Sequence, residues 1–183
     1  MPPPPAAPPS AAEIAIFASW VQAGMPRTTC DAPVDAGPPA PNPYDTPLQC
    51  SNNRTWTRGD RGSPEMHPGA ACIDCHTRER EGPRLSIAGT VYRTAHEPND
   101  CVGGSAAGEA IVQITDARGG VIQLPVNSAG NFFHEGSIAP PYSAKVIAGG
   151  KERVMIKAQT IGDCNSCHTV NGVNDAPGRI MLP

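Results

Sequence analysis

Two five-residue segments with one shared pattern constrain the whole chain: Cys72-Ile73-Asp74-Cys75-His76 and Cys164-Asn165-Ser166-Cys167-His168. In a helical turn, cysteines three positions apart lie on one side, so both thiols can reach the vinyl groups on one edge of a porphyrin. The histidine that follows is placed to bring its imidazole over the ring as an axial ligand of iron. The pattern C-x-x-C-H is the attachment signature of c-type haem, and its double occurrence predicts two covalently bound haem c groups.

The motifs assign the expected attachment residues and proximal ligands directly. We expect thioether bonds to form at four cysteines, Cys72, Cys75, Cys164 and Cys167. We expect His76 and His168 to ligate the two irons. Zinc binding by two C-x-x-C pairs is an alternative. Zinc-binding pairs usually lie closer together in the chain, however, and the two histidines would then have no role.

Each iron needs a second axial ligand, and the other histidines are the first candidates. His96 stands beside Glu97, where a carboxylate can orient an imidazole, so we expect it to be a distal ligand. His67 is the other expected distal ligand. The chain leads from His67 directly to the proximal side of the first haem, so we expect His67 to ligate the iron of the other haem. His134 is expected to be a surface residue at the end of a strand.

Methionines provide the alternative distal ligands. Met155 is the leading methionine for the second haem, although a core position is the usual explanation for such a residue. Met181 is a weaker candidate for the same role, and Met66 is an alternative to its neighbour His67. Bis-histidine ligation would set a low potential, whereas histidine–methionine ligation would raise it.

Three cysteines lie outside the two motifs, Cys30, Cys50 and Cys101. Spare cysteines and thioether bonds are typical of an oxidising compartment, so we expect a periplasmic or extracellular protein. The preferred pairing is a Cys30–Cys50 disulfide that closes a Pro-rich loop and leaves Cys101 unpaired. Cys50–Cys101 is the main alternative, because sequence alone does not fix the pairing.

Export requires a signal, and the first residues do not have the features of one, since no basic region precedes an apolar stretch. We therefore expect that a signal sequence was removed or that the chain belongs to a longer product. No stretch of about 18 apolar residues predicts an integral membrane segment. The net charge of −3 provides no basic footprint for nucleic acid.

Residues 1–25 form the first predicted region, a Pro-rich start followed by a short helix. Ser10 and Glu13 have the spacing of a capping box, apolar residues such as Phe17 and Trp20 recur at helical spacing, and Gly24 can end the helix. This segment resembles the end of small c-type cytochrome domains, where a Met-Pro-Pro stretch precedes a final helix. The resemblance implies a longer multihaem cytochrome with Met1 near iron. The alternative is a helix cap and nothing more.

The rest of the chain divides into a linker and a larger unit. Residues 26–62 are predicted to be a Pro-rich linker or loop, and 63–183 a dihaem unit with a β-sandwich at 85–158. Short runs with partial alternation, separated by Gly and Pro turns, predict about six antiparallel strands. These runs are 85–92, 110–116, 121–126, 131–133, 142–147 and 153–157. The sandwich separates two motifs that are far apart in sequence, and we expect the haem segments to meet on one side of it.

Several of these runs, beginning with Gly-Thr-Val-Tyr at 89–92 and Ala-Ile-Val-Gln-Ile-Thr-Asp at 110–116, resemble carboxypeptidase-regulatory-like β-sandwich modules. The expected fold is therefore mainly β: a transthyretin-like or Ig-like antiparallel sandwich flanked by two short haem-binding helical segments. An insert at 95–101 departs from that family. Residues from about 50 to 183 resemble secreted bacterial multihaem proteins, in which Pro177 would offer its carbonyl to the haem histidine.

The function predicted from these features is electron transfer by a dihaem c-type cytochrome with six-coordinate haems. Its expected partners are redox proteins, and self-assembly or membership of a larger cytochrome complex or filament is a further expectation. The alternative is a dihaem redox enzyme, peroxidase-like, with one open iron site and Glu97 and His134 available nearby. The sequence has no recognisable acid–base group that would lie above a haem, and this favours a carrier over an enzyme.

Overall fold

The structure is a computed structural model, whose described residues are 10–24, 41–103 and 110–183. The chain divides into one unit of residues 1–40 and a second of residues 41–183. The second unit therefore begins within the predicted linker, and residues 41–62 belong to it. Met1, Cys30 and the rest of that linker, 26–40, lie outside the described residues.

In the first unit, helix α1 (Ala11–Gln22) begins with the predicted capping box. The Ser10 hydroxyl accepts from the Glu13 backbone N–H at 3.3 Å, and the Glu13 carboxylate accepts from the Ser10 N–H at 2.7 Å. Gly24, with a φ of +79°, follows the helix end in the left-handed conformation that glycine tolerates. The rings of Phe17 and Trp20 contact each other, yet no residue along α1 is buried.

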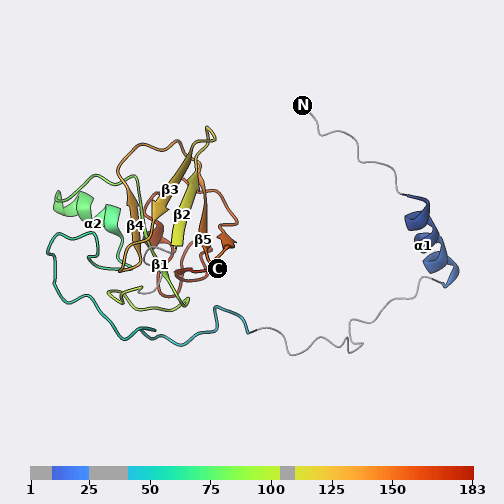
Figure 1. Ribbon diagram of the computed structural model, residues 1–183, viewed down its shortest axis with the longest axis horizontal. Helices are drawn as coiled ribbons and strands as arrows, with labels where there is room; N and C mark the ends of the chain where they lie inside the picture. The colour runs from blue at the N-terminus through green and yellow to red at the C-terminus, as the bar shows by residue number, and fades with distance from the viewer. Residues whose placement is uncertain (1–9, 25–40, 104–109) are drawn as a thin grey trace. The chain divides into compact units, whose positions relative to one another are not determined.

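The second unit contains two β-sheets (Figure 1). The larger is antiparallel, in the order β3-β2-β5-β6, and the smaller has the order β4-β1-β7. Their strands are β1 Ile87–Tyr92, β2 Ala110–Thr115, β3 Val121–Pro125, β4 Asn131–His134, β5 Ser143–Ala148, β6 Lys151–Val154 and β7 Ile180–Met181. The mainly β prediction is confirmed.

Two details of the strand prediction were wrong. The last expected strand, 153–157, is displaced toward the N-terminus as β6, because the turn at Gly149 and Gly150 starts it early. Strand β7 was not predicted, and it pairs with β1 in parallel rather than antiparallel orientation. Two residues are too few to show alternation, so a sequence pattern gives no signal for such a strand.

The hydrophobic core lies between the two sheets. Strand β2 alternates buried and partly buried residues, with Val112 and Ile114 facing inward, as expected for a strand with one covered face. Ile87, Val91 and Phe132 from the smaller sheet belong to the same core. Every residue of β1 is buried, because one face packs on this core and the other is also covered.

The free edge of β1 is completed by residues from the C-terminal third of the chain. The Ala88 N–H donates to the Gly162 carbonyl at 3.0 Å, and the Thr90 N–H donates to the side-chain oxygen of Asn165 at 3.0 Å. Strand β7 takes over at the end of β1, where the Leu182 N–H donates to the Tyr92 carbonyl. The second C-x-x-C-H segment is thereby joined to the edge of a sheet.

Cys50 is bonded to Cys101, so the preferred Cys30–Cys50 pairing and the unpaired Cys101 were wrong. The physical reason is a local pairing of residues 54–56 with 100–102. The Val102 N–H donates to the Arg54 carbonyl at 2.8 Å, and the Trp56 N–H donates to the Asp100 carbonyl at 2.7 Å. This pairing brings the 50–56 segment onto the insert at 95–101.

Among the described helices, none is long and apolar enough to cross a membrane.

Candidate functional site

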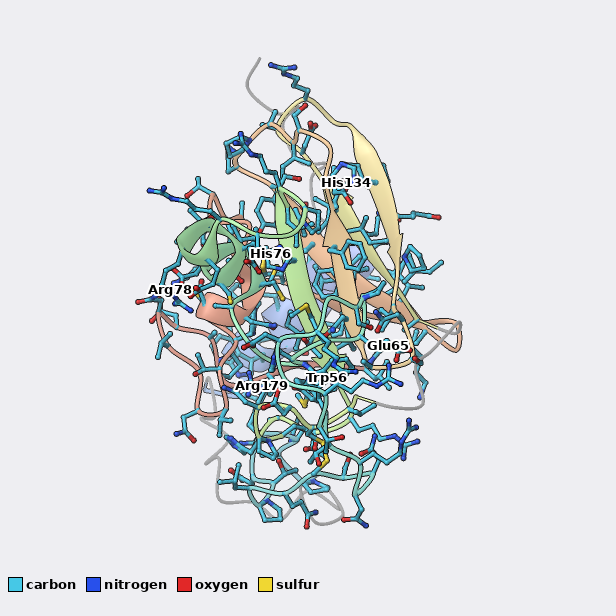
Figure 2. The ribbon with its side chains drawn as sticks, turned by 90° about the vertical axis from the view of Figure 1, so that its left-hand side faces the viewer. Trp56, Glu65, His76, Arg78, His134 and Arg179 are labelled. Atoms are coloured by element: carbon cyan, nitrogen blue, oxygen red, sulfur yellow. A yellow bond between two sulfur atoms is a disulfide. The ribbon has the colours of Figure 1, made fainter. Side chains whose placement is uncertain are left out.

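The first C-x-x-C-H segment forms the start of helix α2 (Cys72–Glu79). Its own N-cap residue, Ala71, has no side-chain hydrogen bond to the helix. Asp163 fills that role from elsewhere in the chain, since its carboxylate accepts from the Asp74 N–H at 2.9 Å. Figure 2 shows Arg78 at the outer side of α2 and His76 on the side nearer β1.

The imidazole of His76 is held by one hydrogen bond. Its Nδ1 lies 3.0 Å from the Pro83 carbonyl oxygen, which can only accept, so Nδ1 carries the proton. Gly82, with a φ of +73°, turns the chain against the ring, and a Cβ at that position would come within 2.9 Å of His76 Cε1. The tautomer leaves Nε2 with a free lone pair, the usual arrangement in histidines that bind metals.

The second segment forms a short 3-10 helix, η1 (Cys164–Ser166), and repeats this arrangement. His168 Nδ1 lies 2.9 Å from the Gly178 carbonyl, again leaving Nε2 free. The acceptor predicted from the resemblance was Pro177, one residue earlier. The Arg179 N–H donates to the Ala95 carbonyl at 2.9 Å and fixes the tail so that Gly178 meets the ring. Burial lowers the pKa of His168, which favours the neutral imidazole.

All four motif cysteines are unpaired thiols. Burial, and then the Asp163 charge, raises the pKa of Cys72 to about 11, and burial raises the pKa of Cys164 to about 12. Zinc binds thiolates, whereas a raised pKa keeps these thiols protonated. The buried thiols therefore give little support to the zinc alternative. Within the described residues, the group with metal-ligand spacing is Cys50, Glu97 and Cys101, whose two sulphurs are consumed by the disulfide.

The two segments lie next to each other, as the sequence predicted. Asn165, only 3% exposed, donates from its side-chain nitrogen to the Ala70 carbonyl at 2.8 Å, just before the first motif. Its side-chain oxygen accepts from Thr90 of β1, while its neighbour Asp163 caps α2. No sequence pattern predicted the roles of Asn165 and Asp163. Asn165 stands between the two cysteines of C-x-x-C, where the motif places no restriction on the residue.

Arg179, labelled in Figure 2, is a buried cation that connects the two segments by hydrogen bonds. It is 2% exposed, and burial lowers the pKa of its guanidinium. Its hydrogen bonds go to uncharged oxygens: the carbonyls of Glu97, Gly69 and His168, and the side chain of Asn99. Gly69 precedes the first motif and His168 ends the second, so one side chain fixes both. A lone arginine near the C-terminus gave no sequence signal for this role.

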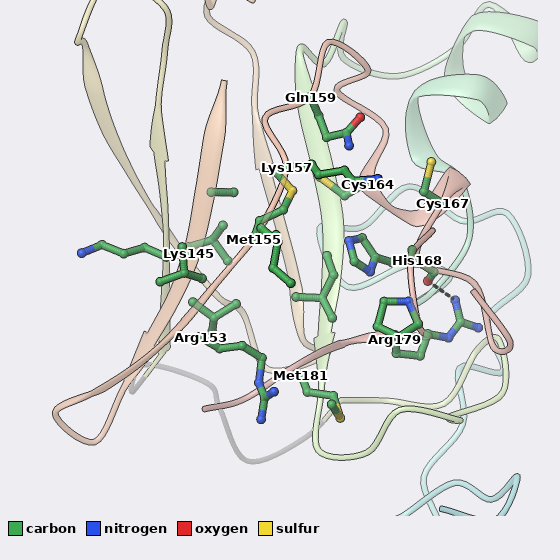
Figure 3. Close-up of a pocket in the computed structure, with 18 of the residues that line it drawn as sticks. Lys145, Arg153, Met155, Lys157, Gln159, Cys164, Cys167, His168, Arg179 and Met181 are labelled. Carbon is green, nitrogen blue, oxygen red and sulfur yellow. Dashed lines mark hydrogen bonds between the residues drawn. The ribbon is translucent and has the colours of Figure 1, made fainter. Parts of the chain in front are cut away.

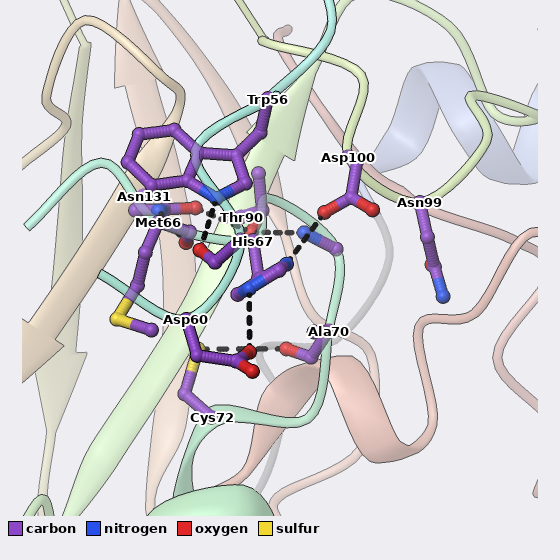
Figure 4. Close-up of polar contacts among 12 residues, drawn as sticks. Trp56, Asp60, Met66, His67, Ala70, Cys72, Thr90, Asn99, Asp100 and Asn131 are labelled. Atoms are coloured by element: carbon purple, nitrogen blue, oxygen red, sulfur yellow. Dashed lines mark hydrogen bonds and ion pairs between the residues drawn. The ribbon is translucent and has the colours of Figure 1, made fainter. Parts of the chain in front are cut away.

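The expected distal ligand His67 is engaged at both ring nitrogens. Figure 4 shows its ring between two carboxylates, with Nδ1 2.9 Å from Asp100 and Nε2 3.2 Å from Asp60. Trp56 contacts the same ring edge-on, with centroids 6.1 Å apart. In this arrangement both ring nitrogens of His67 have carboxylate partners, and its role as a distal ligand stays a prediction.

His96 is engaged at both ring nitrogens in the same way. His96 Nδ1 lies 2.6 Å from the Val170 carbonyl and Nε2 lies 2.7 Å from the Tyr44 carbonyl, so His96 likewise offers no free nitrogen. The resulting contacts tie the insert to both the 41–62 segment and the second motif. His134 is partly buried at the end of β4, where the sequence placed it.

A cavity of about 260 Å³ opens beside the second segment (Figure 3). Its inner wall is apolar and includes Val112, Ile114 and Val146 of the core. The wall also includes both methionines expected as alternative ligands together with the whole second attachment set: Cys164, Cys167, His168, Met155 and Met181. The structure thus brings together the residues predicted for one haem.

Comparisons with protein-family models, with curated proteins and with solved structures found no match to this chain.

Proposed function

We propose that this protein is an electron-transfer protein that holds two haem c groups. One observation carries the proposal: both C-x-x-C-H histidines donate Nδ1–H to a backbone carbonyl and keep Nε2 free, beside two reduced cysteines each. That is the state of a histidine prepared for a metal. The residues that would hold the groups are Cys72, Cys75 and His76, and Cys164, Cys167 and His168.

Attachment requires the thiol state that these cysteines have. Each thiol would add its sulphur to one carbon of a vinyl group and its hydrogen to the other, so the reaction needs neither oxidant nor reductant. The group so bound supplies one-electron chemistry at iron. The chain's own part is to orient both imidazoles and to hold the two segments together through Asp163, Asn165 and Arg179.

The disulfide supports the proposed location. Cys50–Cys101 is a stable bond only outside a reducing cytosol, which agrees with a periplasmic or extracellular protein. The two-sheet unit supports the transthyretin-like assignment at the level of a sandwich of β-sheets. Redox proteins, or further copies of this chain in a larger cytochrome assembly, are the partners that such a carrier would need.

A second candidate function is a redox enzyme with one open iron site. It is favoured by the engagement of His67 and His96, because every ring nitrogen of these two expected distal ligands already has a hydrogen-bond partner. An iron with an open position can bind peroxide or oxygen.

The test is to produce the chain in the periplasm of a host with a c-type haem maturation system. We expect the intact mass to increase by two haems, and C72A/C75A and C164A/C167A each to lose one. His134→Ala is the matched control and should keep both. A protein without covalent haem would contradict the proposal. Low-spin ferric spectra at both irons support the carrier, whereas a high-spin iron that reacts with peroxide supports the enzyme.

A further inference from the structure

The cavity beside the second segment has walls from both sheets. One wall carries Cys164, Cys167 and His168, which follow the edge of β1, and the other carries the inward residues of β2 and β5. Resting on the proposed function, we propose that this cavity binds the porphyrin of the second haem and that Met155 is the distal ligand of its iron.

The lining suits a large apolar ring. Ligand clefts measure roughly 300–1,000 Å³, and this cavity, at about 260 Å³, is slightly smaller and open to the surface. A porphyrin would therefore project through the mouth. The lining includes exposed apolar side chains that such a ring would cover, since Ile156 is 98%, Val154 60% and Ile161 52% exposed. Exposed apolar groups gathered at one opening indicate a ligand or partner.

The cavity also has a cation suited to a propionate of a haem. Arg153 belongs to the lining, together with two lysines that are already paired with carboxylates, Lys145 and Lys157. Arg153 uses its Nε to donate to the Leu182 carbonyl at 3.0 Å, and among the described residues its terminal guanidinium nitrogens have no hydrogen-bond partner and could meet a carboxylate.

The lining contains two thioethers that can serve as distal ligands, those of Met155 and Met181. No histidine other than His168 is part of this wall, in the portion of the chain that the structure describes. The two lysines are paired, Lys145 with Glu152 at 2.6 Å and Lys157 with Asp175 at 2.8 Å. Methionine sulphur is an established partner of histidine at haem iron.

Met155 and Met181 differ in which wall they occupy. Met181 lies in β7, on the tail whose Gly178 carbonyl already holds His168 from its Nδ1 side, and it is 3% exposed. Met155 follows β6 and donates its N–H to Ala144 of β5 at 2.9 Å, so it belongs to the opposite sheet. It is partly buried and packs on the core (Figure 3). A ligand opposite His168 must come from that side.

The test uses the holoprotein with haem content confirmed by mass. Met155→Ala should keep both haems attached, convert one iron of two to high spin, abolish the sulphur-to-iron charge-transfer band and lower one midpoint potential. Met155→His should restore the low-spin state without the sulphur band.

Met181→Leu tests the other methionine of the cavity and should keep the sulphur band, and His134→Ala, outside the cavity lining, is the control that should leave the spectrum unchanged. An unchanged spectrum in Met155→Ala, or loss of the sulphur band in Met181→Leu, overturns the assignment while two attached haems leave the proposed function standing. A chain without attached haem overturns both, and the mass measurement separates these two cases.

Discussion

The first C-x-x-C-H segment lies on an α-helix with an exposed outer side, whereas the second lies in a 3-10 turn at the mouth of a cavity. Their histidines are prepared in the same way, with Nδ1 on the carbonyl of Pro83 or Gly178. Their surroundings differ, because α2 contributes no buried residue and η1 contains buried Asn165. The two imidazoles are thus presented in the same way by carbonyls outside the motifs, and the fold surrounds them with different amounts of protein.

This difference matters because haem potential depends on burial and on the distal ligand. On the proposed function, the second haem is the one whose properties the sandwich core can adjust. The first is the one that is open to solvent and to a partner. Changes that act on both segments, on the link between them or on one segment alone test this comparison.

Arg179→Met should have the largest effect, because Arg179 acts on both segments. The substitution leaves several buried oxygens without donors, among them the carbonyls of Gly69 and His168. Since each buried unpaired acceptor costs about 1–3 kcal/mol, we expect the free energy of unfolding to fall by roughly 3 kcal/mol or more. Urea unfolding followed by circular dichroism measures this loss.

Arg78→Met is the matched control, because Arg78 is an exposed arginine of α2 with partners only at the surface. It should leave the urea midpoint nearly unchanged. Equal losses in the two variants would show that Arg179 is not a structural connection between the segments.

Asp163→Ala should have an intermediate effect, concentrated on the first segment. It removes the carboxylate that caps α2 through the Asp74 N–H. Loss of a helix cap costs about 1 kcal/mol, and hydrogen exchange of the α2 amides should increase more than that of β2. Asp163→Asn keeps an oxygen at the cap and should lose less, so equal exchange in the two variants would exclude the capping role.

Asp163 also makes the free energy of unfolding depend on pH, with a sign that its pKa shift defines. Burial raises the pKa of Asp163, although backbone donors of α2 oppose the shift. A raised pKa in the folded state provides stability that is present below the unfolded-state value of about 3.9 and lost as pH rises through the folded-state value. Asparagine does not titrate. From acidic to neutral pH, the wild type should therefore lose unfolding free energy relative to Asp163→Asn, as urea midpoints measured across that range would show.

The sequence predicted the strands wherever alternation and turn residues were strong. Strand β2 alternates along its whole length, and it was located correctly to within one residue. Strand β7 has two residues and depends on a pairing with β1 that no local pattern indicates. The boundary at residue 63 was misplaced because proline and polar residues at 41–62 are typical of a linker. Their pairing with the insert at 95–101 is non-local.

The residues of the candidate site also fall into two groups, those that the sequence could predict and those that it could not. The six attachment residues could be predicted from two motifs, because the chemistry requires that spacing. Asp163, Asn165 and Arg179 could not, since their roles depend on which distant backbone groups they meet. His96 was expected as a distal ligand because Glu97 stands beside it, and His67 because it shortly precedes the first motif. The acceptors that engage them, such as Asp60 and the Tyr44 carbonyl, become neighbours only in the fold.

Gly82→Ala should have the smallest effect on stability and should act on one segment alone. A left-handed alanine costs roughly 1 kcal/mol, and the new Cβ would also meet the His76 ring, 2.9 Å from Cε1. Gly119→Ala is a matched control, because Gly119 has a φ of +81° and a Cβ added there would have nothing within 4 Å. Both should lower the urea midpoint, and Gly82→Ala should do so by somewhat more because of the added contact with the ring. Only Gly82→Ala should shift the imidazole resonances of His76, and those of His168 should stay in place. A shift at both histidines would mean that the two segments are one coupled site rather than two separate ones.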